Sequence, residues 1–312
     1  MAESSSIIET HALSKSFGAT CAVESLDLSI TRGEIFGLVG PDGAGKTTVL
    51  RMLAAILNPT SGRATVASFD TVKQSEDIKR HLGYMSQQFS LYGDLSVLEN
   101  MNFFADLFGI KRQSRAARIE RLLDFSRMGP FRSRRSAQLS GGMQKKLSLA
   151  CTLIHDPQIL LLDEPTTGVD PVSRREFWDI LTELRIGGTT IVVSTPYMDE
   201  AERCSRVGLM YHGRLIVCDA PDRIRNMVEG ELLAVRPDNL QRAATLLKGH
   251  PGVVEIQTYG DRLHIFVDDA KTRGPELIAF LLESGMKCAG PWPAQPRMEE
   301  AFISLIGKRE KV

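Results

Sequence analysis

Gly40-Pro-Asp-Gly-Ala-Gly45-Lys46-Thr47-Thr48 is the stretch that decides the fold of this chain of 312 residues. It fits the pattern G-x-x-x-x-G-K-[ST]. The apolar run Glu34–Val39 before it is typical of a buried strand, and residues 48–57 after it favour a helix. A glycine-rich turn between a strand and a helix presents backbone N–H groups and a partial positive charge to an anion. The sequence therefore predicts a phosphate-binding loop formed by Gly40, Pro41, Asp42, Gly43, Ala44, Gly45, Lys46, Thr47 and Thr48.

Two side chains of this loop have specific expected roles. Lys46 is expected to reach the β- and γ-phosphates of ATP, as a catalytic residue, and the hydroxyl of Thr47 to ligate Mg²⁺. A glycine-rich turn that binds no ligand is the alternative. The Lys-Thr pair in register and the correct flanking elements argue against it.

A second informative stretch is Ile159-Leu-Leu-Leu-Asp163-Glu164. Its apolar residues predict a central parallel strand, and ligands of such sheets lie at the carboxyl ends of the strands. Asp163 is therefore a candidate Mg²⁺ ligand, and Glu164 a candidate catalytic base that polarises the attacking water. The alternative is that the acidic pair only caps the turn that Pro165 continues.

The third stretch, Leu139-Ser140-Gly141-Gly142-Met143, opens a long amphipathic helix. Locally it predicts only a capped helix start. The Ser140 hydroxyl, the glycine backbone N–H groups and the positive end of the helix dipole are also suited to binding an anion. Since the chain already has a complete phosphate loop, we expect that anion to be held by a second subunit.

These three stretches together resemble the ATPase subunits of ATP-binding cassette (ABC) transporters. Leu139–Gly142 matches the signature motif of that family, with Met143 where many members have Gln, and the resemblance covers about residues 7–230. It implies a head-to-tail dimer, either homo- or heterodimeric, in which each ATP lies between the Walker A loop of one subunit and the signature of the other. It further implies ATP hydrolysis coupled to transport through a separate integral-membrane permease.

The resemblance assigns three further positions. Phe17 is similar to the aromatic residue that stacks on adenine, a core phenylalanine being the alternative. Gln87 resembles the Q-loop glutamine that touches Mg²⁺, with Gln88 as the neighbouring alternative. Asp170, in Thr167-Gly-Val-Asp170, resembles the D-loop residue at the dimer seam.

One family residue is absent. After the strand Thr190–Ser194, the family has a switch histidine that contacts the γ-phosphate, and here that position is Pro196. Proline has neither an imidazole nor a backbone N–H, so it donates no hydrogen bond. We expect weakened ATP hydrolysis; substitution by Thr195 or Tyr197 as a donor is the alternative.

Composition limits the class of protein. Lys+Arg and Asp+Glu each number 38, so no nucleic acid is expected as a partner. The five cysteines show no C-x-x-C spacing, which indicates reduced thiols and no zinc site. No apolar segment has membrane length and the N-terminus is polar. The expected location is therefore cytoplasmic, peripheral on the inner face of the cell membrane.

The fold class predicted is α/β. Residues 7–230 form a P-loop ABC ATP-binding domain with a β-rich layer and a helical subdomain at about 88–155. The pattern then changes: residues 231–312 have the order β-α-β-β-α-β, followed by a final helix. This order predicts a small ferredoxin-like accessory domain, for which a dimer brace is favoured over a ligand sensor.

The leading functional interpretation is the motor subunit of a bacterial ABC export system for drugs or polymers. A soluble mechanical ABC ATPase acting on ribosomes or DNA is a second class, disfavoured because the chain holds one cassette and no coiled-coil insertion. A half-degenerate regulatory cassette that pairs with an active partner is the third, and Pro196 supports it.

Overall fold

The computed structural model describes residues 6–88 and 91–309. The chain forms two compact units, Met1–Cys218 and Asp219–Val312. The sequence places the domain boundary at residue 230, and that boundary stays a prediction. Residues 89–90 of the expected helical subdomain and residues 310–312 of the expected accessory domain lie outside the described residues.

A six-stranded sheet forms the centre of the first unit, in the order β10-β9-β3-β8-β7-β6. Its members are β3 (Ile35–Val39), β6 (Leu82–Met85), β7 (Ile159–Asp163), β8 (Thr190–Thr195), β9 (Arg206–Tyr211) and β10 (Arg214–Asp219). Strands β3, β7 and β8 are buried along their whole length, and β8 pairs in parallel with both of the others. Their carboxyl ends therefore bring Gly40, Glu164 and Pro196 to one edge of the sheet.

A second, antiparallel sheet has the order β2-β1-β4-β5. It comprises β1 (Ser6–Phe17), β2 (Thr20–Thr31), β4 (Ser61–Val66) and β5 (Phe69–Asp70). Helix α1 (Lys46–Leu53) contacts strands of both sheets, and its residues Val49, Leu50 and Leu53 are fully buried in the core that the two sheets share. Burial of these three side chains stabilises α1 by roughly 5 kcal/mol or more, so the end of the phosphate loop is fixed to the core of the unit.

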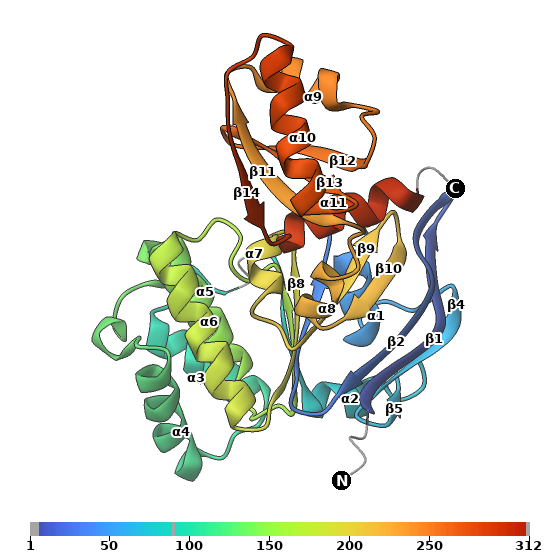
Figure 1. Cartoon of the computed structure of the whole chain (residues 1–312). Coiled ribbons are helices and arrows are strands. Elements are labelled where there is room, and N and C mark those ends of the chain that lie inside the picture. The colour runs from blue at the N-terminus through green and yellow to red at the C-terminus, as the bar shows by residue number, and fades with distance from the viewer. Residues whose placement is uncertain (1–5, 89–90, 310–312) are drawn as a thin grey trace. The chain divides into compact units, whose positions relative to one another are not determined.

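The helical subdomain is built from α3 (Val97–Leu107), α4 (Arg112–Phe125) and α5 (Gly141–Thr152), and α6 (Pro171–Ile186) lies beside them in Figure 1. Helix α3 begins with a capping box formed by Ser96 and Glu99. Short helices α2 (Ser75–His81) and α7 (Met198–Ala201) and the 3-10 turns Gly129–Phe131 and Ser136–Gln138 complete the unit. Within the described residues, no helix is long and apolar enough to cross a membrane.

His155, in the turn after α5, joins this turn to the central sheet. Its Nε2 lies 3.1 Å from the carbonyl oxygen of Leu82, and its ring stacks on Phe108 with centroids 3.9 Å apart. Burial lowers the pKa of His155 below its ordinary value of 6.5, so the folded protein favours the neutral imidazole.

This burial predicts a pH dependence of stability. Below pH 6.5 the unfolded chain takes up a proton on His155 before the folded chain does, so the free energy of unfolding falls as pH falls through that value. The variant His155→Gln is expected to lose this part of the acid sensitivity in urea unfolding at pH values on both sides of 6.5. His11→Gln, at an exposed histidine, is the control. Equal pH slopes for wild type and His155→Gln would contradict the prediction.

The second unit is a four-stranded antiparallel sheet in the order β12-β13-β11-β14. Its elements are α8 (Pro221–Arg225), β11 (Glu231–Pro237), α9 (Leu240–Leu247), β12 (Val253–Tyr259), β13 (Arg262–Val267), α10 (Ala270–Glu283), β14 (Cys288–Ala294) and α11 (Met298–Arg309). Strands β11 to β14 with α9 and α10 follow the β-α-β-β-α-β order expected from the sequence. One face of the sheet packs on α9 and α10 through Leu233, Ile265 and Leu277.

Candidate active site

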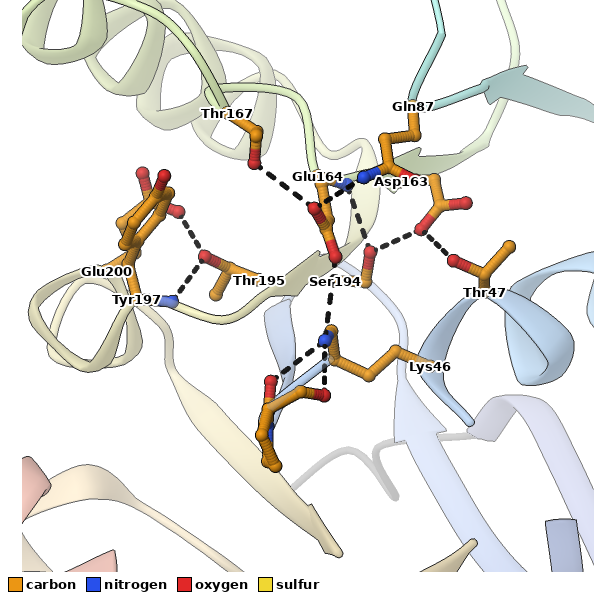
Figure 2. Close-up of polar contacts among 12 residues, drawn as sticks. Lys46, Thr47, Gln87, Asp163, Glu164, Thr167, Ser194, Thr195, Tyr197 and Glu200 are labelled. Carbon is orange, nitrogen blue, oxygen red and sulfur yellow. Dashed lines mark hydrogen bonds and ion pairs between the residues drawn. The ribbon is translucent and has the colours of Figure 1, made fainter. Parts of the chain in front are cut away.

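Lys46 lies at the centre of the candidate site, with only 3% of its surface exposed. Its Nζ donates hydrogen bonds to the carbonyl oxygens of Gly40 (2.8 Å) and Pro41 (3.0 Å), and lies 3.5 Å from Oε1 of Glu164 (Figure 2). A buried ammonium surrounded by oxygen atoms is well placed to receive another anionic group.

Gly45, which directly precedes α1, is a position of the loop that requires glycine. Its φ is +99°, in the left-handed region, and a Cβ there would lie 2.4 Å from the carbonyl oxygen of Ala22. The glycine therefore permits a close approach of β2 to the loop, in addition to the approach of an anion expected from the sequence.

Asp163 is buried, with 1% of its surface exposed, and receives hydroxyl groups from separate elements. Thr47 Oγ1, on α1, donates to Asp163 Oδ1 over 3.0 Å, and Ser194 Oγ, on β8, donates to the same oxygen over 2.6 Å. The Tyr84 hydroxyl reaches Oδ2 at 3.4 Å. The predicted Mg²⁺ ligands Thr47 and Asp163 are thus adjacent, although they are separated by more than a hundred positions along the chain.

Glu164 is held by groups on three sides (Figure 2). Its Oε2 accepts hydrogen bonds from Gln87 Nε2 (2.8 Å) and Thr167 Oγ1 (3.2 Å), and its Oε1 faces Lys46. Its backbone has φ +45°, and its N–H donates to Ser194 Oγ over 3.0 Å. Positive φ is costly for a residue with a side chain and concentrates at functional sites. A catalytic role for Glu164 stays a prediction, which this backbone conformation favours over a simple turn cap.

A pocket of about 450 Å³ adjoins these residues. Its lining includes the loop residues 42–48, Glu164, Gln87 and Phe17. Phe17 is 52% exposed, so the alternative of a core phenylalanine does not fit. Of the two glutamines left open, both are exposed, but the side chain of Gln87 contacts Glu164, whereas Gln88 only accepts from Ser86 with its backbone oxygen.

Ser140 is the N-cap of α5, and its Oγ accepts the N–H of Met143 over 3.4 Å. Ser140 and Gly141 are exposed, whereas a Cβ on Gly142 would lie 2.5 Å from Cβ of Ser173. Gly142 therefore allows α5 and α6 to pack closely, while Ser140 and Gly141 keep a polar helix start at the surface. Leu139 is buried and anchors the turn.

Comparison with known proteins decides the family. Residues 23–167 match the family model described as ABC transporter. The chain is 44% identical over 292 residues to the probable multidrug ABC transporter ATP-binding protein YbhF of Escherichia coli strain K12, covering 92% of this chain and 49% of that protein. It is 32% identical over 310 residues to the daunorubicin resistance ATP-binding protein DrrA2 of Streptomyces coeruleorubidus, covering 97% and 95%. The chain belongs to the ABC transporter family.

The ABC cassette fold is also found in a solved structure. The dimeric post-hydrolysis structure of the ATP-binding cassette MJ0796, bound to ADP and Pi, superimposes with a TM-score of 0.63 at 25% identity, covering 68% of this chain and 98% of that chain. The predicted family and the α/β cassette fold are confirmed. The chain spans about half the length of YbhF.

At the switch position of this ABC cassette, Pro196 directly follows β8. The neighbouring Thr195 donates its hydroxyl proton to Oε2 of buried Glu200 over 2.6 Å and accepts the N–H of Tyr197 over 3.1 Å. The Tyr197 ring lies against the guanidinium of Arg174, 4.4 Å from its centroid. Thr195 therefore has no hydroxyl proton left to donate, so Tyr197 remains as the alternative donor expected from the sequence.

Asp170, the predicted D-loop residue, is the N-cap of α6. Its Oδ1 accepts the N–H groups of Val172 (3.1 Å) and Ser173 (2.9 Å). These hydrogen bonds lower the pKa of Asp170 below its ordinary value, the bond from Ser173 acting most strongly. Asp170 is exposed, so its cap leaves the carboxylate at the surface of the cassette.

Sequence reasoning missed two residues of this site. Ser194 links Asp163 to the backbone of Glu164. Its polar side chain at the end of an otherwise apolar strand was the signal that could have identified it. Lys145, on α5, donates from Nζ to the carbonyl oxygen of Gln87 over 2.7 Å. Burial lowers the pKa of Lys145, while the charges of Asp163 and Glu164 oppose the shift. No local pattern distinguishes this lysine from its neighbours on α5.

Proposed function

We propose that this chain is the ATP-binding and ATP-hydrolysing motor subunit of an ABC export system, working with a separate integral-membrane permease. The observation that carries the proposal is a pocket of about 450 Å³ lined by buried Lys46 and Glu164, with Asp163 bonded to the lining residue Thr47, in a chain whose signature stretch exposes Ser140. Lys46 would hold the β- and γ-phosphates of ATP, and Phe17 at the pocket wall would stack on adenine.

The donor set fits Mg²⁺. The Thr47 hydroxyl and the Asp163 carboxylate are hard oxygen donors in direct contact, with the Gln87 amide on the adjoining loop. A metal bound mainly through substrate phosphates needs few protein ligands. Accordingly, the described residues contain no cluster of three or more His, Cys, Asp or Glu side chains suited to a metal. When bound, Mg²⁺ would neutralise charge on the phosphates.

Glu164 is the candidate general base. Its carboxylate lies between Lys46 and Gln87, at the edge of the phosphate pocket, and its backbone is fixed by Ser194. In this role it accepts the proton of the attacking water while Lys46 stabilises the negative charge of the transferring group. The Ser194 contacts fix the positions of Asp163 and Glu164 relative to each other, and Glu164 lines the pocket.

The second subunit follows from the exposed signature turn. The relative MJ0796 is a dimer with ADP and Pi, and we infer the same head-to-tail assembly here, with Ser140, Gly141 and Met143 completing the partner's site. Asp170 would lie near this seam. ATP that touches both subunits in the closed dimer favours that state through differential affinity.

The proposals that this chain drives export and lies at the cell membrane are based on its relatives. YbhF is described as a probable multidrug transporter ATP-binding protein and DrrA2 as a daunorubicin resistance ATP-binding protein. An exporter motor of this kind would lie at the cytoplasmic face of the cell membrane, on its permease. The half-degenerate cassette is the second candidate, and the engaged Thr195 beside Pro196 favours it.

The shared ATP site predicts the effect of a bulky cation on the signature turn. Ser140→Arg is expected to lower ATP turnover by at least about tenfold, because the side chain would block the phosphates held by the facing subunit. ATP binding by the single subunit should persist, since Ser140 lies outside its own pocket.

The test is steady-state phosphate release by the purified chain, with nucleotide binding measured in parallel. Ser133→Arg, at an exposed serine of the same subdomain, is the matched control. Unchanged turnover in Ser140→Arg, together with a monomeric mass of the Glu164→Gln variant at saturating Mg-ATP, would remove the basis for the shared site.

A further inference from the structure

The second unit contains a pocket of its own, about 410 Å³ in volume. It lies against the strands β11, β13 and β14, near the β12–β13 turn and the segment that leads into α11. Pockets that hold small molecules have about this size, roughly 300–1,000 Å³. None of its residues takes part in the cassette chemistry described above.

Aromatic rings form much of its wall. Trp292 is 41% exposed, although large aromatic side chains are usually covered. Tyr259 stacks on His264 with ring centroids 4.9 Å apart and an interplanar angle of 15°. Exposed and half-buried rings around a hollow offer flat surfaces on which a planar group can stack.

His264 lies in the pocket lining but is only 7% exposed. Its Nδ1 contacts Oε1 of Glu300, which is itself 2% exposed. The carboxylate fixes the ring and leaves the other nitrogen, Nε2, without a hydrogen-bond partner among residues 6–88 and 91–309. With Nδ1 donating to the carboxylate, Nε2 of the neutral ring is an acceptor, so His264 fixes the position of Tyr259 rather than donating to an anion.

Cationic groups complete the pocket. The guanidinium of Arg262 lies 5.0 Å from the Trp292 ring centroid, and that of Arg297 lies 4.9 Å from the Tyr259 centroid. Arg297 also donates to the Tyr259 hydroxyl, and within the described part of the chain it forms no ion pair with a carboxylate. The acid at the pocket, Asp261, pairs with Arg236 over 2.8 Å and with Arg262 over 3.8 Å. Among the lining residues, two arginines therefore stand against one acid, Asp261, while the Glu300 carboxylate is engaged by His264 and by the backbone N–H of Arg297.

We propose that this pocket binds a small planar anion of the aromatic carboxylate class. The planar part would stack on the exposed Trp292 ring, beside Arg262, since the Tyr259 ring already contacts both His264 and Arg297. The carboxylate would be held by Arg297, whose guanidinium has free donors. This places a ligand site on the accessory domain, apart from the site proposed for ATP.

The probe for the test is 1-naphthoate, with naphthalene-1-carboxamide as its neutral counterpart of nearly equal shape. Isothermal titration calorimetry on the full chain is expected to show naphthoate binding at least about tenfold more tightly than the carboxamide, since only the anion gains charge-assisted hydrogen bonds. Trp292 fluorescence should change with the same saturation curve. Trp178 is 1% exposed and supplies an unchanging background.

Variants separate this pocket from nonspecific attraction. Trp292→Leu and Arg297→Gln are each expected to weaken naphthoate binding at least about tenfold. Lys271→Gln removes one exposed cation of the same unit outside the pocket and should change nothing. Both pocket positions are exposed, so the variants should keep the thermal unfolding midpoint of the wild type.

Three results would overturn the proposal. The first is equal binding of naphthoate and the carboxamide. The second is naphthoate binding that survives both pocket variants. The third is that the wild type binds no naphthoate, whereas Trp292→Leu changes the mass of the protein assembly in solution. That result would make this surface a contact between copies of the chain.

Discussion

Glu164→Gln is expected to lower the rate of ATP turnover about a thousandfold, because a positioned general base contributes roughly 10²–10⁴ to such a reaction. The amide keeps the shape of the side chain and one oxygen for the hydrogen bond from Thr167, which joins Glu164 over 3.2 Å. It loses the negative charge that faces Lys46 at 3.5 Å and the capacity to take a proton from water. The chemical step is therefore impaired while nucleotide binding is kept.

The measurement has two parts. Phosphate release gives turnover, and the mass of the protein in Mg-ATP shows whether the unreacted nucleotide holds two subunits together. We expect the variant to accumulate as a dimer where the wild type does not. Glu183→Gln, at an exposed glutamate of α6, is the control for loss of one acid. Wild-type turnover in Glu164→Gln would assign the base to another residue.

Pro196→His is expected to raise ATP turnover by at least about tenfold. One charge-assisted contact to a transferring phosphoryl group contributes about 2–4 kcal/mol, which corresponds to a factor of roughly 30–800 in rate. The substitution restores both an imidazole and a backbone N–H at the end of β8. Thr195 cannot supply this contact, because its hydroxyl proton is donated to Glu200 over 2.6 Å.

Pro196→Ala distinguishes the two restored groups, because it returns the N–H without the imidazole. We expect Pro196→Ala to stay near the wild-type rate and Pro196→His to exceed it, each measured at saturating Mg-ATP. A wild-type chain with ordinary turnover that Pro196→His does not increase would show that Pro196 does not limit hydrolysis. The half-degenerate interpretation would then lose its support as well.

The cassette fold was predictable because its signals are local. The spacing of Gly40, Gly45 and Lys46, and the apolar strand before Asp163, specify a loop and a strand end within a few residues. Parallel pairing then brings these strand ends to one edge. In the second unit, the alternation of strands and helices was sufficient for the β-α-β-β-α-β order, because each element has its own periodicity.

Side-chain partners at the site were much less predictable. Phe17 could be a core residue or a pocket residue until its 52% exposure was known, and Gln87 could not be separated from Gln88 before its contact with Glu164. Lys145 on α5 and Ser194 on β8 were missed altogether. Each of these contacts joins residues from different elements, and no spacing along the chain encodes such a meeting.

The sequence by itself determined the phosphate loop, the acidic strand end, the signature turn and the loss of the switch histidine, since each depends on residue identity within one short segment. Only the tertiary structure decided that the Thr195 proton is taken by Glu200, and that Trp292, Tyr259 and His264 surround a hollow on the accessory domain. The physical reason is that hydrogen bonds and ring contacts depend on distances between atoms, and folding sets those distances for residues that the chain keeps far apart.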